Sequence, residues 1–224
     1  GAGARGRGGQ RRPGLSEKGH RRGREDMKRD NTNVVSAGVG GQGDVLMSDL
    51  LAAMGAAEGF DAKKSDSLGL AVRGGNVFSH VRWGEKISSP VIGKGQADYL
   101  LILEWLEAVR QRPYLKKGGR VMINDARIYP MLVSTGQAQY PDQDSILKAF
   151  EDWASEVTIV PALSLAVALG NAKVANTVLI GALARKIDSN PEVWNQVMRD
   201  RLPSKLLDIN LKAFDRGYNY SGQC

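Results

Sequence analysis

The chain has 224 residues, of which 42% are hydrophobic and 25% charged, so it is long enough to bury one sizeable core. Its single cysteine, Cys224, and its two histidines, His20 and His80, exclude an internal disulfide and exclude zinc or iron–sulfur ligation by this chain alone. No apolar run approaches the roughly 20 residues of a membrane-spanning helix, so we expect a cytoplasmic protein without a membrane partner.

The net charge of +7 is concentrated at the N-terminus, where residues 1–30 carry ten Lys and Arg against four acids. Residues 1–33 form a basic tail rich in glycine and arginine, with no apolar periodicity, which predicts disorder. Two interpretations are open. In the first, the tail is a mis-assigned start or a solvated extension, since Met27 stands just before the first predicted strand. In the second, it binds RNA through its arginines.

After the tail, short β-type runs alternate with helical ones, which predicts an α/β fold. We expect a three-layer, Rossmann-like domain over residues 34–217 with a mostly parallel sheet, followed by a C-terminal tail, 218–224. The alternating pattern after residue 75 predicts an antiparallel excursion. The predicted strands are 34–37, 59–63, 77–83 with 86–92, 97–103, 120–124 and 157–160. The predicted helices are 45–57, 104–112, 142–155, 162–169, 175–187, 191–201 and 203–214.

A glycine cluster follows the first predicted strand and precedes the first predicted helix. Gly38, Gly40 and Gly43 match the G-x-G-x-x-G pattern of dinucleotide-binding loops. In such proteins an acid about 20 residues further on binds the ribose, but Lys63 and Lys64 occupy that place, which disfavours an NAD-dependent dehydrogenase. The loop therefore either receives an anionic group at the helix N-terminus or permits close packing against a protein partner.

A second loop carries an arginine followed by two glycines. Arg73 could offer a bidentate fork to a phosphate, or it could form a structural ion pair with Asp66. His80 is better explained as a packed strand histidine than as a general base, and Arg82 shares its face of the strand. We assign no catalytic residue and no metal ligand. The candidate binding residues are Gly38, Gly40, Gly41, Gln42, Gly43, Arg73, Gly74 and Gly75.

Taken in order, these motifs resemble the gamma-type domain of the 2-oxoacid:ferredoxin oxidoreductases. Among these, the chain is most similar to the small (beta) subunits of indolepyruvate:ferredoxin oxidoreductases, and the resemblance runs from residue 34 to residue 217. The segments that carry it are 38–43, 69–75, 80–84, 97–98, 104–110, 115–119, 140–141, 170–171, 176–183, 203–205 and 210–214.

The resemblance implies a subunit that completes an enzyme without being one alone. Family members oxidatively decarboxylate an aryl 2-oxoacid such as indolepyruvate, form an acyl-coenzyme A and pass electrons to ferredoxin. The resemblance places the thiamine diphosphate and the iron–sulfur clusters on a large partner subunit, which also meets ferredoxin, and leaves coenzyme A at the interface. The expected contribution of this chain is one wall of the substrate or coenzyme A channel.

One segment departs from the family pattern. Where the family commonly reads Glu-x-His-Gly-Met-x-Gln-Arg, this chain has Asp66, Leu68, Gly69, Leu70, Val72 and Arg73. The change from hydrogen-bonding to aliphatic side chains indicates a shifted oxoacid preference. The alternative function is a nucleotide- or RNA-binding Rossmann-like module that acts through its basic tail.

Overall fold

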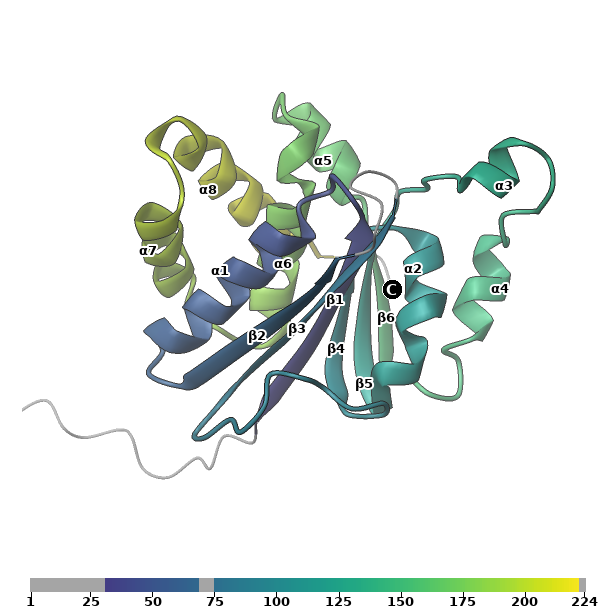
Figure 1. The fold of residues 1–224 in the computed structure, drawn as a ribbon. Helices are drawn as coiled ribbons and strands as arrows, with labels where there is room; N and C mark the ends of the chain where they lie inside the picture. The colour runs from purple at the N-terminus through teal and green to yellow at the C-terminus, as the bar shows by residue number, and fades with distance from the viewer. Residues whose placement is uncertain (1–30, 69–74, 222–224) are drawn as a thin grey trace, which may run out of the picture.

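A computed structural model describes residues 31–68 and 75–221, which form a six-stranded sheet between two layers of helices (Figure 1). The strand order is β2-β3-β1-β4-β5-β6. Strands β1, β4, β5 and β6 run parallel, while β3 is antiparallel to both β1 and β2. The strands are β1 (Thr32–Val39), β2 (Asp61–Leu68), β3 (Asn76–Gly84), β4 (Ala97–Ile102), β5 (Leu115–Asn124) and β6 (Glu156–Val160).

The helices divide between the two faces of this sheet (Figure 1). On one face lie α1 (Asp44–Ala57), α6 (Ala175–Lys186), α7 (Pro191–Arg201) and α8 (Ser204–Tyr218). On the other face lie α2 (Trp105–Gln111), which leads into the 3-10 turn η1 (Arg112–Tyr114), and α4 (Gln143–Lys148). Two helices lie toward the carboxyl ends of the parallel strands: α3 (Met131–Ser134) and α5 (Ala162–Ala168), the latter followed by the turn η2 (Ala172–Val174).

The central strands are apolar on both sides because both sheet faces are covered. In β1, Val34 joins the core under α1 and α6, whereas Val35 joins the core under α2, and both are fully buried. In β4, Leu101 and Leu100 divide in the same way. Consecutive buried aliphatic residues are the pattern of a parallel strand inside a three-layer fold.

Helices α6 and α8 cross so closely that glycine is required at the contact. A Cβ atom at Gly181 would lie 2.1 Å from the Phe214 carbonyl oxygen, and one at Gly217 would lie 1.8 Å from the Val178 carbonyl oxygen. Only residues without a side chain allow the two backbones to touch in this way. The crossing holds α8 against the helix that supports the glycine loop.

The predicted α/β class, the mostly parallel sheet and the antiparallel strand after residue 75 are confirmed. The predicted strand over 86–92 is wrong, because the backbone donors there serve side chains rather than a neighbouring strand. The Ile87 N–H donates to Asp61 Oδ2 at 2.8 Å, and the Ile92 N–H donates to His80 Nδ1 at 2.7 Å. Pro90 lies between them and has no N–H to give.

Three boundaries differ most from the prediction. Strand β2 starts and ends later than predicted and runs to Leu68. It is half-exposed, and its mostly polar sequence does not show the apolar pattern by which a strand is recognised. Strand β5 begins at Leu115, before the two glycines, where the pairing with β4 shifts register and Gly118 takes a φ of +78°. Helix α4 ends at Lys148, although Asp142 caps it as predicted, accepting from the Ser145 N–H at 2.7 Å.

Candidate functional site

The glycine cluster forms the turn from β1 into α1 at the carboxyl edge of the parallel strands. Gly41 and Gly43 have φ angles of +104° and +85°, a region that disfavours every residue with a Cβ atom. Gly43 is the N-cap of α1, and its carbonyl accepts from Asn176 Nδ2 of α6 at 3.1 Å. A Cβ at Gly43 would come within 2.7 Å of the same nitrogen. The backbone of the loop is thus held against α6.

Gln42 braces the loop from within. Its Oε1 accepts from the Val39 N–H at 2.7 Å, and its Nε2 donates to the Leu103 carbonyl at 3.1 Å. A Cβ at Gly38 would lie 2.9 Å from Gln42 Oε1, which explains why the first position of the cluster is also glycine. Both ends of the Gln42 amide are bonded inside the chain, which fixes its orientation, so we take the backbone N–H groups as the main donors that the loop offers a ligand.

The second candidate loop meets the first one. The Gly40 N–H donates to the Gly75 carbonyl at 2.9 Å, which brings two of the candidate residues into contact. Arg73 and Gly74 lie outside the described residues. Asp66, the alternative partner of Arg73, pairs with Lys64 Nζ at 2.7 Å. Within residues 31–68 and 75–221, the N–H groups of Gly41 and Gly43 have no hydrogen-bond acceptor.

The end of β4 connects the loops of this edge. The Leu103 carbonyl accepts from Gln42 Nε2 and also from Asn124 Nδ2, each at 3.1 Å. Asn124 ends β5, is 2% exposed, and accepts through Oδ1 from the Leu163 N–H of α5 at 3.0 Å. Three segments distant in sequence therefore meet at one carbonyl, and Asn124 links them to a fourth, the start of α5. Sequence reasoning missed Asn124, because no local pattern reveals a partner that lies 21 residues away.

Glu104 holds the next turn of this edge. It is 1% exposed, and its Oε2 caps α2 by accepting from the N–H groups of Leu106 at 2.8 Å and Glu107 at 3.2 Å. Its Oε1 accepts from the Ile128 N–H at 3.2 Å and from the Tyr140 hydroxyl. Burial, followed by the nearby carboxylate, raises the pKa of Tyr140, so this phenol stays a hydrogen-bond donor. The carboxylate thereby fixes the segment that follows β5.

A buried acid lies directly behind the glycine loop. Asp44, the first residue of α1, is 3% exposed, and its Oδ2 accepts from the Ser79 hydroxyl at 2.6 Å. Burial raises the pKa of Asp44 to about 6, and the Ser79 and Ser36 hydroxyls oppose that rise. The sequence marks this residue only as an acid that directly precedes the predicted helix 45–57.

His80 is a packed strand histidine, as the sequence indicated. It is 5% exposed, and its ring meets the edge of Tyr114 with 5.1 Å between the centroids. Burial, followed by the charge of Arg82, lowers its pKa, so the ring is neutral. Arg82 donates through Nε to Asn33 Oδ1 at 2.8 Å and is engaged within the chain. Neither residue is arranged for proton transfer.

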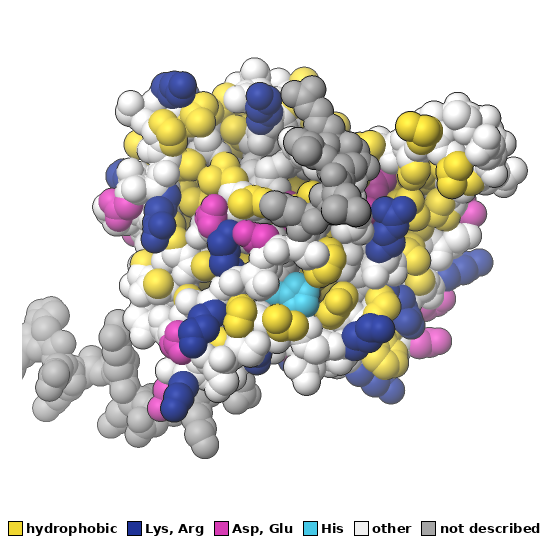
Figure 2. Space-filling model, viewed as in Figure 1, with side chains coloured by type: hydrophobic (Ala, Val, Ile, Leu, Met, Phe, Trp, Pro, Cys, Tyr) yellow, Lys and Arg dark blue, Asp and Glu magenta, His cyan; other side chains and the backbone are white. Residues whose placement is uncertain are grey.

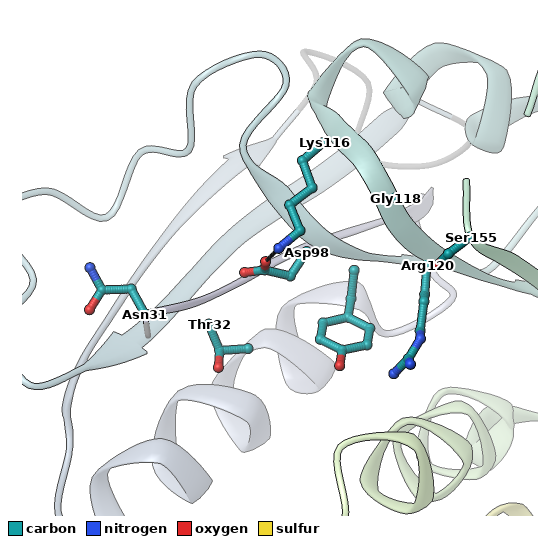
Figure 3. Close-up of a pocket in the computed structure, with 8 residues that line it drawn as sticks. Asn31, Thr32, Asp98, Lys116, Gly118, Arg120 and Ser155 are labelled. Carbon is teal, nitrogen blue, oxygen red and sulfur yellow. Dashed lines mark hydrogen bonds and ion pairs between the residues drawn. The ribbon is translucent and has the colours of Figure 1, made fainter. Parts of the chain in front are cut away.

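A polar pocket of about 290 Å³ opens at the opposite, amino edge of the sheet (Figure 3). Figure 3 shows Lys116 of β5 reaching to Asp98 of β4, with which it forms an ion pair. Arg120, also on β5, lies 3.8 Å from the carboxylate of Glu156. Lys116 and Arg120, the cations of this pocket, are therefore already paired inside the chain. The carboxyl edge of the parallel strands remains the candidate site.

The described part of the chain contains no cysteine and no group of three or more His, Cys, Asp or Glu residues that could hold a metal ion. Iron–sulfur clusters are held by thiolates, so these residues do not fit such a cluster. Among the helices described here, none is long and apolar enough to cross a membrane.

The family model for pyruvate ferredoxin/flavodoxin oxidoreductase matches residues 33–220. The chain belongs to this family. Its relatives include the indolepyruvate oxidoreductase subunit IorB of Thermococcus kodakarensis, which is 37% identical over 188 residues, or 83% of this chain and 93% of the relative. The subunit IorB of Pyrococcus horikoshii is 36% identical over the same shares. The chain is accordingly a small subunit of a 2-oxoacid oxidoreductase, and the family prediction is confirmed.

Solved structures share the fold at lower identity. The gamma subunit of the keto/oxoacid ferredoxin oxidoreductase from Geobacter sulfurreducens has a TM-score of 0.64 and 23% identity, covering 84% of this chain and 95% of that one. The 2-oxoglutarate:ferredoxin oxidoreductase from Magnetococcus marinus, solved with 2-oxoglutarate, coenzyme A and succinyl-CoA, has a TM-score of 0.66 and 18% identity. It is covered over only 30% of its chain, so there the same fold is one part of a longer polypeptide.

Proposed function

We propose that this chain completes a 2-oxoacid:ferredoxin oxidoreductase for aryl substrates of the indolepyruvate type. In this proposal a larger partner subunit carries the thiamine diphosphate and the iron–sulfur clusters. The described residues of this chain lack the thiolates that a cluster needs, which supports the placement of the clusters. The names of the relatives, at 36–37% identity over 188 residues, support the substrate class. The alternative of a nucleotide- or RNA-binding module has no support from the family match.

Within this enzyme we assign the glycine loop to one wall of the coenzyme A channel. The supporting observation is the pair of N–H groups at Gly41 and Gly43, which face no acceptor among the described residues and stand at the N-terminus of α1. Such groups favour the phosphates or carboxylates of an anionic ligand. Gln42 and Asn176 hold the loop in this shape, so the donors need no rearrangement on binding.

Thiamine diphosphate, when bound to the partner, supplies the carbanion chemistry that cleaves the oxoacid. What the residues of this chain contribute is positioning. The loop donors orient the anionic end of the coenzyme, the amides of Gln42 and Asn124 keep the channel wall rigid, and the buried Glu104 fixes the neighbouring segment. Arg73 and Gly74 belong to the same proposed wall by their place beside Gly75, which contacts Gly40.

A matched pair of glycine substitutions tests the assignment. Gly41 and Gly59 both have positive φ angles, +104° and +87°, and a Cβ at either would meet no atom within 4 Å. Gly41→Ala and Gly59→Ala therefore carry similar backbone strain, about 1 kcal/mol. Only Gly41→Ala narrows the proposed channel. We expect it to raise the KM for coenzyme A by about tenfold or more, while Gly59→Ala leaves that KM unchanged.

The assay is viologen or ferredoxin reduction by the enzyme reconstituted with its larger subunit, with indolepyruvate, phenylpyruvate, pyruvate and 2-oxoglutarate compared. Equal KM values for coenzyme A in the two variants would remove the loop from the channel. Reduction that needs no coenzyme A, or that prefers a non-aryl oxoacid, would contradict the proposed reaction.

A further inference from the structure

The segment from Ile128 to Pro141, which we call the arm, differs from the rest of the chain in carrying no charge. It contains no Asp, Glu, Lys or Arg, although 25% of all residues are charged. Figure 1 shows α3 at its tip, standing away from the two helical layers. Figure 2 shows hydrophobic side chains over this projection, at the right of the view.

The tip exposes large apolar side chains. Met131 is 80% exposed, Leu132 57% and Tyr129 56%, and Ile128 at the base is 37% exposed. At about 200 Å² for a large side chain, these residues leave on the order of 400 Å² of apolar surface in contact with water. Single exposed apolar residues are ordinary, but a continuous group on an uncharged projection indicates an interaction surface.

Hydrogen bonds within the chain fix the base of the arm before any partner binds. The Ile128 N–H and the Tyr140 hydroxyl both donate to the buried carboxylate of Glu104, one at each end of the arm. The rings of Tyr129 and Tyr140 meet edge to face, with 5.2 Å between their centroids. A projection with a fixed base loses less conformational entropy on binding than a mobile loop would.

The chemistry of the arm narrows the choice of partner. Nucleic acids and anionic membranes are bound through Lys and Arg, and the arm has neither. Pairing of two arms would bury on the order of 400 Å² from each copy, about half of what a stable interface needs from one partner. The arm is therefore suited to be one anchor within a larger protein interface.

A larger interface is available along the same edge of the sheet. Leu163 and Val167 of α5 are exposed by 37% and 57%, and no charged residue lies between positions 161 and 172. Glu104, which fixes the arm, directly follows Leu103, whose carbonyl holds Gln42 of the glycine loop. A protein bound to the arm would therefore also reach the glycine loop, which forms the proposed wall of the coenzyme A channel.

We propose that the arm inserts into an uncharged groove of the larger catalytic subunit and orients the glycine loop toward it. This inference rests on the proposed function, because that function supplies the partner. It adds the surface through which the two subunits meet.

The test uses the tagged full-length chain produced in its native cells. One variant combines Met131→Asp with Leu132→Asp at the tip, and the matched control is Val91→Asp, at a residue that is 58% exposed near the opposite edge of the sheet. We expect the tip variant to recover the iron–sulfur- and thiamine-bearing subunit about 30-fold or more less efficiently than wild type, since two anchor side chains acquire charge. The control should recover it within about twofold of wild type.

Unfolding midpoints of the purified chains check that both variants fold, because all three substituted side chains are exposed. A photo-crosslinker placed at residue 131 should join the chain to the iron–sulfur-bearing subunit. Undiminished recovery by the tip variant, or crosslinks that join two copies of this chain, would overturn the arm as the anchor. A wild-type chain that purifies with no cluster-bearing subunit would overturn the proposed function as well.

Discussion

Asp44 offers the sharpest quantitative prediction. Burial raises its pKa from 3.8 to about 6, which corresponds to about 3 kcal/mol at 1.36 kcal/mol per pH unit. The N-terminus of α1 favours the ionised carboxylate by up to about 1 kcal/mol, which opposes this cost. We therefore expect ionised Asp44 to destabilise the folded chain by about 2 kcal/mol at pH 7, and Asp44→Asn to recover about that amount.

The sign follows from proton uptake. Between pH 3.8 and about pH 6 the folded state holds a proton on Asp44 that the unfolded state has released, so stability from this group falls as the pH rises through that window. Above the window the cost is constant. The free energy of unfolding of Asp44→Asn minus that of wild type should thus be near zero at pH 4 and about 2 kcal/mol at pH 7 to 8.

Urea titrations followed by tryptophan fluorescence at each pH give this difference directly. The control is Asp208→Asn, whose carboxylate is 81% exposed beside Lys212 and should change stability by less than about 0.5 kcal/mol at every pH. A difference for Asp44→Asn that stays constant from pH 4 to 8 would refute the burial argument. So would a variant that is less stable than wild type at pH 8.

Three further substitutions test the packing around the site. Tyr140→Phe removes the hydroxyl that donates to Glu104 and should cost about 1–2 kcal/mol in the free energy of unfolding, with faster protease cleavage in the arm. Unchanged cleavage would show that this hydrogen bond does not fix the base of the arm. Gln42→Ala loses two hydrogen bonds and should raise the KM for coenzyme A while kcat changes little; a fall in kcat alone would contradict its role as a brace. Gly217→Ala places a methyl group 1.8 Å from the Val178 carbonyl and should lower stability by about 2 kcal/mol or more in urea titrations, whereas wild-type stability would show that the α6–α8 crossing can relax.

The sequence was most informative where a local pattern carries the physics. The apolar run of β4 and the strand–glycine–helix order around α1 identified the central sheet and the candidate loop. Strand β2 was harder to place, because the polar sequence DAKKSDSL of a half-exposed strand resembles a surface loop. The arm received no assignment, because its one short helix, α3, has four residues and no strong cap.

The place of the glycine loop between a strand and a helix was predicted from the sequence, but the contacts that hold the loop were not. The glycines were found because left-handed turns leave a sequence mark. The roles of Gln42, Asn124 and Glu104 depend on contacts with residues 61, 21 and 36 positions away, and such contacts leave no local mark. The assignment of Gln42 to an anionic ligand remains a prediction, and in this structure its amide is bonded to Val39 and Leu103.

The hydrogen bonds at the Leu103 carbonyl couple the segments that form the candidate site. It accepts from the amides of Gln42 and Asn124, and Asn124 in turn accepts from the Leu163 N–H of α5. Opening any one of these segments breaks a bond to another, so we expect the edge to exchange its amide hydrogens as one cooperative unit and not loop by loop. A ligand or subunit that rests on the glycine loop would slow exchange at Val39 and Leu163 together.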